Sequence, residues 1–205
     1  VVRPGPGGVH AAGASVTVDV LLFGHGNRHL PYVLHAFAQA GQRGIGQGNG
    51  RLELDQVTQQ TPAGDWRPIY RPGGALQPLP PALIEPPPGP ARLRLALETP
   101  LRLRQAETLL GPDAFQFGAL FANLLRRISL LTTFHTDTPL ETDFAGLSRA
   151  GWAIPHRAAR LRWHEWARYS SRQDALIQMG GLIGEIDLDG AGLEPFWPYL
   201  WLGQW

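Results

Sequence analysis

The sequence contains no cysteine and no lysine, and its only methionine is Met179. The absence of cysteine excludes disulfide scaffolds, thiolate metal sites and cysteine nucleophiles. No hydrophobic run is long enough to span a bilayer, and no signal peptide opens the chain. We therefore expect a soluble cytoplasmic protein that makes no membrane contact.

All 18 basic residues are arginine. Codon bias in a GC-rich genome produces such a composition, but arginine also supplies planar, bidentate donors for phosphate. The formal net charge is +1 over 205 residues, so an anion site must be a local cluster of charges rather than a field of the whole protein. The chain begins at Val1 instead of methionine, which predicts a fragment of a longer gene product.

The first part of the chain predicts a strand, a helix and a second strand. Apolar residues alternate over residues 15–23, as in a half-buried strand, and recur at helical spacing over 29–41. A glycine-rich turn over 44–50 then leads to a short strand over 51–57. We interpret residues 1–60 as one structural unit.

Proline dominates the next stretch. Residues 61–90 contain few periodic apolar positions and end in "QPLPPALIEPPPGP", which is typical of a stiff connector that is partly polyproline II. We place a domain boundary here, so that residues 91–205 form a second unit.

The second unit predicts the element order β-α-β-β-α. Its expected elements are a strand over 91–104, a helix from about Asp113, short helical segments over 139–152, strands over 157–171 and 180–188, and a helix over 193–205. The long helix carries one apolar stripe, formed by Phe117, Phe121, Leu124, Ile128 and Leu131. This order indicates an α+β, ferredoxin-like β-α-β-β-α-β fold without its last strand.

The histidines and the glycine turn of the first unit are weak candidates for chemistry. The turn over 44–50 lacks the lysine and serine or threonine of a P-loop and precedes a strand, so a tight helix-to-strand connection is the simpler interpretation. His25, His29 and His35 do not have metal-ligand spacing, so we expect no metal site. His25, in its loop, remains a candidate general acid or base, with an ordinary surface histidine as the alternative.

Arginines of the second unit form a possible basic strip. Arg126 and Arg127 lie on or beside the polar side of the predicted helix, and Arg160, Arg162 and His164 share one face of a predicted strand. Together with Arg168, Tyr169 and Arg172 they would give a basic surface with an aromatic ring, as single-stranded RNA sites require. A solvated strand face is the alternative. We interpret Trp163 and Trp166 as core and hinge residues.

The series "RLRWHEWARYSSRQ…MGGLIGEIDLDG…PFWPYLWLGQW", with the earlier stretch "VDVLLFGHGNRHLPYVLHAFAQAGQRGIGQGNGRLELDQV", resembles the CRISPR-associated endoribonucleases that cut precursor CRISPR RNA, within the RAMP superfamily. The resemblance covers nearly the whole chain apart from the proline-rich connector. It implies two ferredoxin-like (RRM-like) folds in tandem, of which the first is incomplete here. It also implies that the main catalytic residues lie upstream of Val1, and that a glycine-rich loop follows Trp205.

The resemblance further implies metal-independent cleavage of CRISPR repeat RNA without a cofactor, and other CRISPR-associated proteins as partners, with no direct contact to DNA. Gly180 and Gly181 would let backbone amides approach the RNA, while Arg168 and Arg172 would hold phosphates and Tyr169 would stack. Structural packing of a β-hairpin is the alternative for this segment. Two alternatives for the whole chain are a non-catalytic RNA-binding subunit of a CRISPR effector complex and a protein-interaction module.

Overall fold

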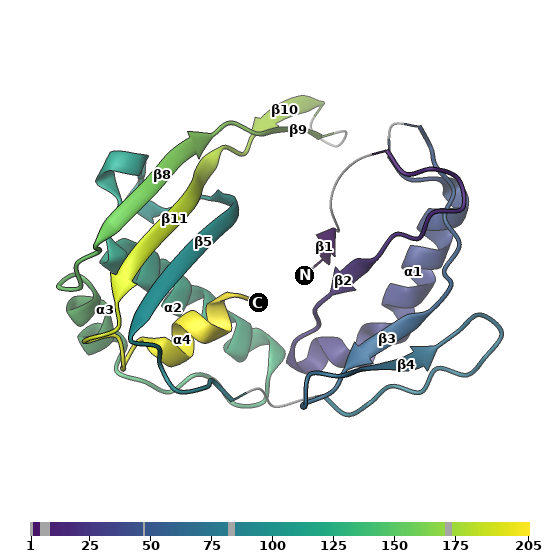
Figure 1. The fold of residues 1–205 in the computed structure, drawn as a ribbon, viewed down its shortest axis with the longest axis horizontal. Helices are drawn as coiled ribbons and strands as arrows, with labels where there is room; N and C mark the ends of the chain where they lie inside the picture. The colour runs from purple at the N-terminus through teal and green to yellow at the C-terminus, as the bar shows by residue number, and fades with distance from the viewer. Residues whose placement is uncertain (1, 5–8, 47, 82–84, 171–173) are drawn as a thin grey trace. The chain divides into compact units, whose positions relative to one another are not determined.

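The computed structural model describes residues 2–4, 9–46, 48–81, 85–170 and 174–205. The chain divides into two units (Figure 1). Unit 1 consists of Val1–Glu85, Leu131–Thr138 and Trp205, and unit 2 of Pro86–Leu130 and Pro139–Gln204. The division at Glu85 falls inside the predicted connector; the domain boundaries at residues 60 and 90 stay a prediction.

Unit 1 contains two antiparallel strand pairs and one long helix. Its elements are β1 (Val2–Pro4), β2 (Val18–Val20), the 3₁₀ helix η1 (Gly24–His29), α1 (Leu30–Arg43), β3 (Val57–Gln60) and β4 (Trp66–Tyr70). β1 pairs with β2 and β3 pairs with β4. The helix begins with Pro31 in its first turn, where a missing N–H costs nothing, and ends at Gly44, whose φ of 100° suits glycine.

The predicted order strand, helix, strand is confirmed in this unit, but the strand positions shift. The second strand begins only at Val57, where the prediction ended. β4 lies inside residues 61–90, which were predicted to be an extended connector. Thr61 N donates to Asp65 O at 2.7 Å and Gly64 N to Thr61 O at 2.9 Å. These two bonds close a tight turn that lets the polar segment form a hairpin without a periodic apolar pattern.

A three-stranded antiparallel sheet in the order β5–β11–β8 forms the centre of unit 2. The elements of this unit are β5 (Arg92–Leu101), β6 (Arg104–Gln105), β7 (Thr108–Leu109), η2 (Pro112–Ala114), α2 (Phe117–His135), α3 (Phe144–Gly151), β8 (Ala158–His164), β9 (Ala167–Ser170), β10 (Ala175–Gln178), β11 (Gly181–Asp189) and α4 (Trp197–Gly203). The main elements follow the order β5, α2, β8, β11, α4, which confirms the predicted α+β, ferredoxin-like arrangement.

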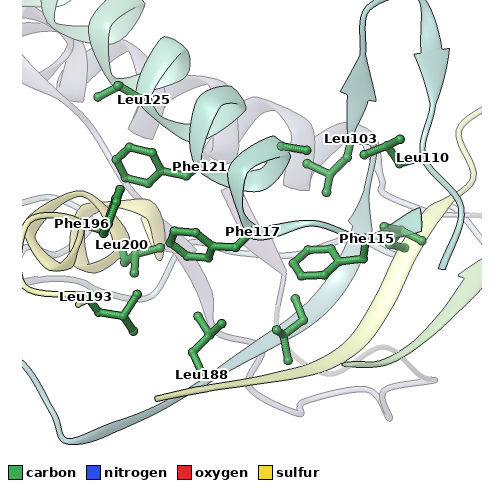
Figure 2. Packing of buried hydrophobic residues seen from close by; sticks show 13 residues of the cluster. Leu103, Leu110, Phe115, Phe117, Phe121, Leu125, Leu188, Leu193, Phe196 and Leu200 are labelled. Carbon is green, nitrogen blue, oxygen red and sulfur yellow. The ribbon is translucent and has the colours of Figure 1, made fainter. Parts of the chain in front are cut away.

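One face of this sheet is covered by helices α2 and α4 and forms the apolar core (Figures 1 and 2). Phe121 is fully buried, and its ring lies 4.7 Å from that of Phe196 in an edge-to-face contact. Burial of each such side chain contributes roughly 1.5–3 kcal/mol. The predicted stripe is confirmed at Phe117, Phe121 and Ile128, which are buried. The helices therefore leave the opposite face of the sheet, here called the outer face, without a helical cover.

The strand predicted over 157–171 is wrong in extent, because the chain leaves the sheet after His164. Residues 167–170 form β9, which pairs with β10 in a separate hairpin that extends beyond the end of β8 and β11 (Figure 1). Strand propensity alone does not reveal that β8 pairs with β11 whereas β9 pairs with β10, since β8 and β9 are both extended. In the described segments, no helix has the length and apolar character needed to cross a membrane.

Candidate functional site: an arginine-bearing hairpin and a histidine turn

The β9–β10 hairpin carries the segment that the sequence singled out. Arg168 and Tyr169 lie in β9, where they pair in register with Ile177 and Leu176 of β10. Arg172 lies outside the described residues. The hairpin therefore presents at least part of the predicted RNA-binding segment on a two-stranded projection from the sheet (Figure 1).

Two hydrogen bonds from Arg102, which follows β5, fasten the base of the hairpin, and a third joins its two arms. Arg102 Nη1 donates to the carbonyl oxygens of Gln178 at 3.1 Å and Gly180 at 3.2 Å. Met179 N donates to Trp166 O at 2.6 Å, which continues the pairing between the two hairpin strands toward the sheet. A guanidinium that bridges two carbonyls fixes the direction in which the hairpin leaves the sheet.

Gly180 and Gly181 are buried at this base. A Cβ on Gly181 would lie 2.8 Å from Leu101 O. A Cβ on Gly180 would lie 2.8 Å from Trp163 Nε1, the atom that donates to Glu165 Oε1 at 2.6 Å. Both distances are too short for a side chain, so close packing alone requires glycine here. The predicted contact of their amides with RNA stays a prediction.

The outer face of the sheet holds a network of ion pairs. Asp187 on the central strand β11 accepts from Arg94 Nε at 2.8 Å on one side and from Arg160 Nη2 at 2.7 Å on the other. Its hydrogen bonds to Arg94 and Arg160 hold the pKa of the Asp187 carboxyl below its ordinary value of 3.8. Arg160 also lies 3.2 Å from Glu185. Arg160, predicted as part of a free basic strip, is therefore neutralised by acidic neighbours.

Arg162 differs from Arg160 although the two stand on the same face of β8. Its cross-strand neighbour on β11 is Ile183, and its exposed guanidinium makes no hydrogen bond or ion pair within the described ranges. The predicted strip is thus only partly available to a ligand. Arg160 is paired with acidic side chains, whereas Arg162 has no acidic partner among the described residues.

Arg126 and Arg127 lie on α2 and are both exposed, next to the buried Leu125 and Ile128. Since α2 covers the inner face of the sheet, these two arginines stand on the helix side and Arg162 on the opposite side. Within the described residues, Arg126 and Arg127 therefore do not form a continuous strip with Arg162.

His25 lies in η1 of unit 1, and its Nε2 is 2.9 Å from Asp137 Oδ1. The side chains are 37% and 94% exposed, respectively. Two features hold the turn that carries His25 in place. Asn27 Nδ2 donates to Gly24 O at 2.8 Å. Gly24 also packs so closely against the carbonyl of His135 that a Cβ at this position would clash with it. No sequence pattern points to Asp137, since 112 residues separate it from His25.

The glycine turn between α1 and β3 uses its backbone groups internally. Ile45 and Gly50 exchange hydrogen bonds at 2.8 and 3.0 Å, and Leu52 N donates to Gly41 O at 3.1 Å. These contacts support a tight connection rather than a phosphate cradle. Among the residues with described placement, no group of three or more histidine, aspartate or glutamate side chains is arranged to hold a metal ion.

Comparisons with known proteins match both parts of the chain. The family model described as CRISPR-associated endoribonuclease Cas6 matches residues 95–205, and a model described as an N-terminal domain matches residues 1–83. No curated protein matches the chain. A solved structure of a Cas6 product complex matches at 19% identity with a TM-score of 0.33, over 57% of this chain and 44% of the solved one. The chain thus spans less than half the length of that protein, and a likeness at this TM-score carries no argument about structure.

Proposed function

This chain belongs to the family of CRISPR-associated endoribonucleases Cas6, and we propose that it cleaves CRISPR repeat RNA into guide RNAs without a metal ion. The observation that carries the proposal is the family match over residues 95–205, which includes the arginine-bearing hairpin. In the proposed reaction the 2′-hydroxyl of one nucleotide attacks the adjacent phosphate. The bond from phosphorus to the 5′ oxygen of the next nucleotide breaks, leaving a 2′,3′-cyclic phosphate and a 5′-hydroxyl.

This reaction requires a group that removes the 2′-hydroxyl proton and a group that protonates the leaving oxygen. We assign one of these roles to His25. An ionised carboxylate only accepts hydrogen bonds, so the contact with Asp137 favours the tautomer in which Nε2 carries the proton. The Nδ1 atom of neutral His25 is then the one that takes a proton, and Nδ1–H of the imidazolium is the one that gives it back.

The hairpin supplies the proposed grip on RNA. Arg168 and Arg172 would bind phosphates through charge-assisted hydrogen bonds, and Tyr169 would stack on a base or support the arginines. Arg126 and Arg127 on α2 would add a second phosphate contact. For Gly180 and Gly181 we propose mainly the packing role that their buried positions support, because the fixed hairpin base then holds the arginine-bearing strand in place.

A cleavage assay in the presence of EDTA tests this function. Repeat RNA incubated with the chain and excess EDTA should yield products that end in a cyclic phosphate. Activity that appears only when magnesium is added would contradict the metal-independent mechanism. The assay is run with both this chain and the full-length gene product.

A second function, RNA binding without cleavage in a complex with other CRISPR-associated proteins, has one observation in its favour. In the described part of unit 1, the ring of His25 contacts only Asp137 among charged groups, and no arginine there is in contact with the pair to stabilise a developing negative charge. Repeat RNA that is retained but uncut by the full-length protein would support this function. The third alternative, a protein-interaction module, predicts no retention of RNA.

A further inference from the structure

The two tryptophans at the end of β8 have different environments. Trp163 packs against the apolar core, and its Nε1 donates to Glu165 Oε1 at 2.6 Å. Trp166, three residues later, is 47% exposed. A tryptophan ring with this exposure offers an aromatic face on which a ligand can stack. Trp163 is a core residue as expected, whereas Trp166, which lies between β8 and β9, is not part of the core.

The backbone of Trp166 is held in place although its ring is exposed. Its carbonyl accepts the 2.6 Å hydrogen bond from Met179 N, and Arg102 fixes the facing segment through Gln178 O and Gly180 O. A ring on a fixed backbone loses little conformational freedom when a ligand stacks on it. Trp166 is therefore better suited to binding than an exposed tryptophan on a loose loop would be.

The outer face near the end of β8 carries an arginine without an acidic partner among the described residues, while Glu165, the acid next to Trp166 in sequence, accepts a hydrogen bond from Trp163. Side chains alternate along a strand, so Arg162 and His164 project from the outer face, opposite to the core residues Leu161 and Trp163. Arg160, further along β8, is occupied by Asp187 and Glu185. Arg162 makes no contact with an acid in the described residues. The free positive charge of β8 thus lies at the end nearest to Trp166.

We propose that this end of β8 is a contact site for single-stranded RNA, in which Trp166 stacks on an unpaired base and Arg162 binds a phosphate next to that base. The inference rests on the proposed function and extends it to two residues outside the RYSSRQ segment. Arginine and an exposed aromatic ring on a sheet are the two groups that single-stranded RNA sites combine. The site would prefer single strands, because a base inside a duplex has no free face for the ring.

The test measures binding of a labelled single-stranded repeat RNA and of the same sequence as a duplex. Trp166→Ala should weaken single-strand binding by about 5- to 150-fold, the range for one lost stacked base, and should affect duplex binding far less. Trp166→Phe should retain most of the affinity. Arg162→Ala should weaken binding and make it less sensitive to salt. The matched controls are Trp66→Ala, a tryptophan of unit 1 that is 57% exposed, and Arg149→Ala, an exposed arginine of α3; both should bind like the wild type.

A fluorescence titration covers the case in which Trp166→Ala does not fold. Stacking on a base quenches tryptophan emission, so Trp166→Phe should lose part of the quenching that RNA causes in the wild type while it keeps its thermal transition. The inference would be overturned if a folded Trp166→Ala bound RNA with wild-type affinity, or if RNA quenched the emission of Trp166→Phe as much as that of the wild type. Wild-type cleavage by these variants would leave the proposed function standing. A wild type that binds no single-stranded RNA overturns both. A change of oligomeric state in Trp166→Ala, with unchanged RNA affinity, would mark a protein contact instead and also overturn the inference.

Discussion

His25 Nε2 lies 2.9 Å from Asp137 Oδ1, across 112 residues of sequence. The contact joins the turn before α1 to the segment that follows α2 within unit 1. It orients a histidine whose remaining ring nitrogen is available for proton transfer, so it is the arrangement in the described residues that is best suited to acid–base chemistry.

Removal of the His25 ring should lower the rate of RNA cleavage and leave binding intact. A general acid or base contributes about 10²- to 10⁴-fold, so His25→Ala should reduce the single-turnover rate within that range. His29→Ala changes a neighbouring histidine of the same turn, whose ring lies 6.2 Å from that of Tyr32, and should cleave normally. Equal rates for His25→Ala and the wild type would remove His25 from the mechanism.

Asp137 should matter much less than His25. A hydrogen-bonded pair with this exposure contributes about 1 kcal/mol at most, so Asp137→Asn should reduce the cleavage rate by no more than about fivefold. RNA affinity should not change. A loss of cleavage as large as that of His25→Ala would assign Asp137 a direct role in the reaction.

Acid should weaken unit 2 through Asp187. Its pKa is lowered in the folded protein by Arg94 and Arg160, so its ionised form stabilises the fold above the ordinary pKa of 3.8, and that stability is lost as the pH falls through the lower, folded-state pKa. Asp187→Asn should therefore melt at a lower temperature than the wild type near pH 7. The difference should shrink below pH 4.

Thermal melts from pH 2 to 7 measure this effect, with Asp113→Asn in the exposed turn η2 as the control. The control should follow the wild-type curve. If Asp187→Asn and the wild type differ by a constant amount at every pH, the ion pairs of the outer face do not stabilise the fold in the way described.

Gly181 should not tolerate a side chain. A Cβ there would lie 2.8 Å from Leu101 O, and relief of such a clash costs about 1–3 kcal/mol. Gly181→Ala should lower the free energy of unfolding by that amount in urea. Gly111→Ala, at a position with no atom within 4 Å of the new Cβ, should be neutral. A fully stable Gly181→Ala would show that the hairpin base is loosely packed.

The two hairpin arginines should determine the salt dependence of RNA binding. If Arg168 and Arg172 hold phosphates, replacing both with alanine should weaken repeat-RNA binding and reduce the slope of log affinity against log salt by about 0.7 for each lost contact. The fold should survive, because neither arginine belongs to the apolar core. Filter binding across a salt series, with a thermal melt of the same variant, measures both. Unchanged affinity in the folded double variant would exclude these residues from the site.

Local patterns predicted much of unit 2. The spacing of Phe117, Phe121 and Ile128 identified the buried side of α2 because helical periodicity lies within a few turns of sequence. In the same way, Leu93 and Leu95 of β5 alternate with arginines in the sequence and pack against the core. These features need no knowledge of the partner element, so the sequence alone is sufficient for them.

Features that depend on distant partners escaped prediction. The change of direction after His164 follows from tight packing of Gly180 against Trp163 and Glu165, which the extended pattern of 157–171 does not encode. The pairing of Arg160 with Asp187 joins two strands 27 residues apart. In both cases the residues can be identified in the sequence. Whether Arg160 is solvated or paired, however, depends on the strand register, which local sequence patterns do not encode.

The most direct test of the central claim uses repeat RNA with a single 2′-deoxy substitution at the nucleotide before the scissile phosphate. With EDTA present, the full-length protein should bind this RNA as tightly as the unmodified one and should cut only the unmodified RNA, leaving a cyclic phosphate. Cleavage of the 2′-deoxy RNA at the same position would contradict the proposed attack by the 2′-hydroxyl.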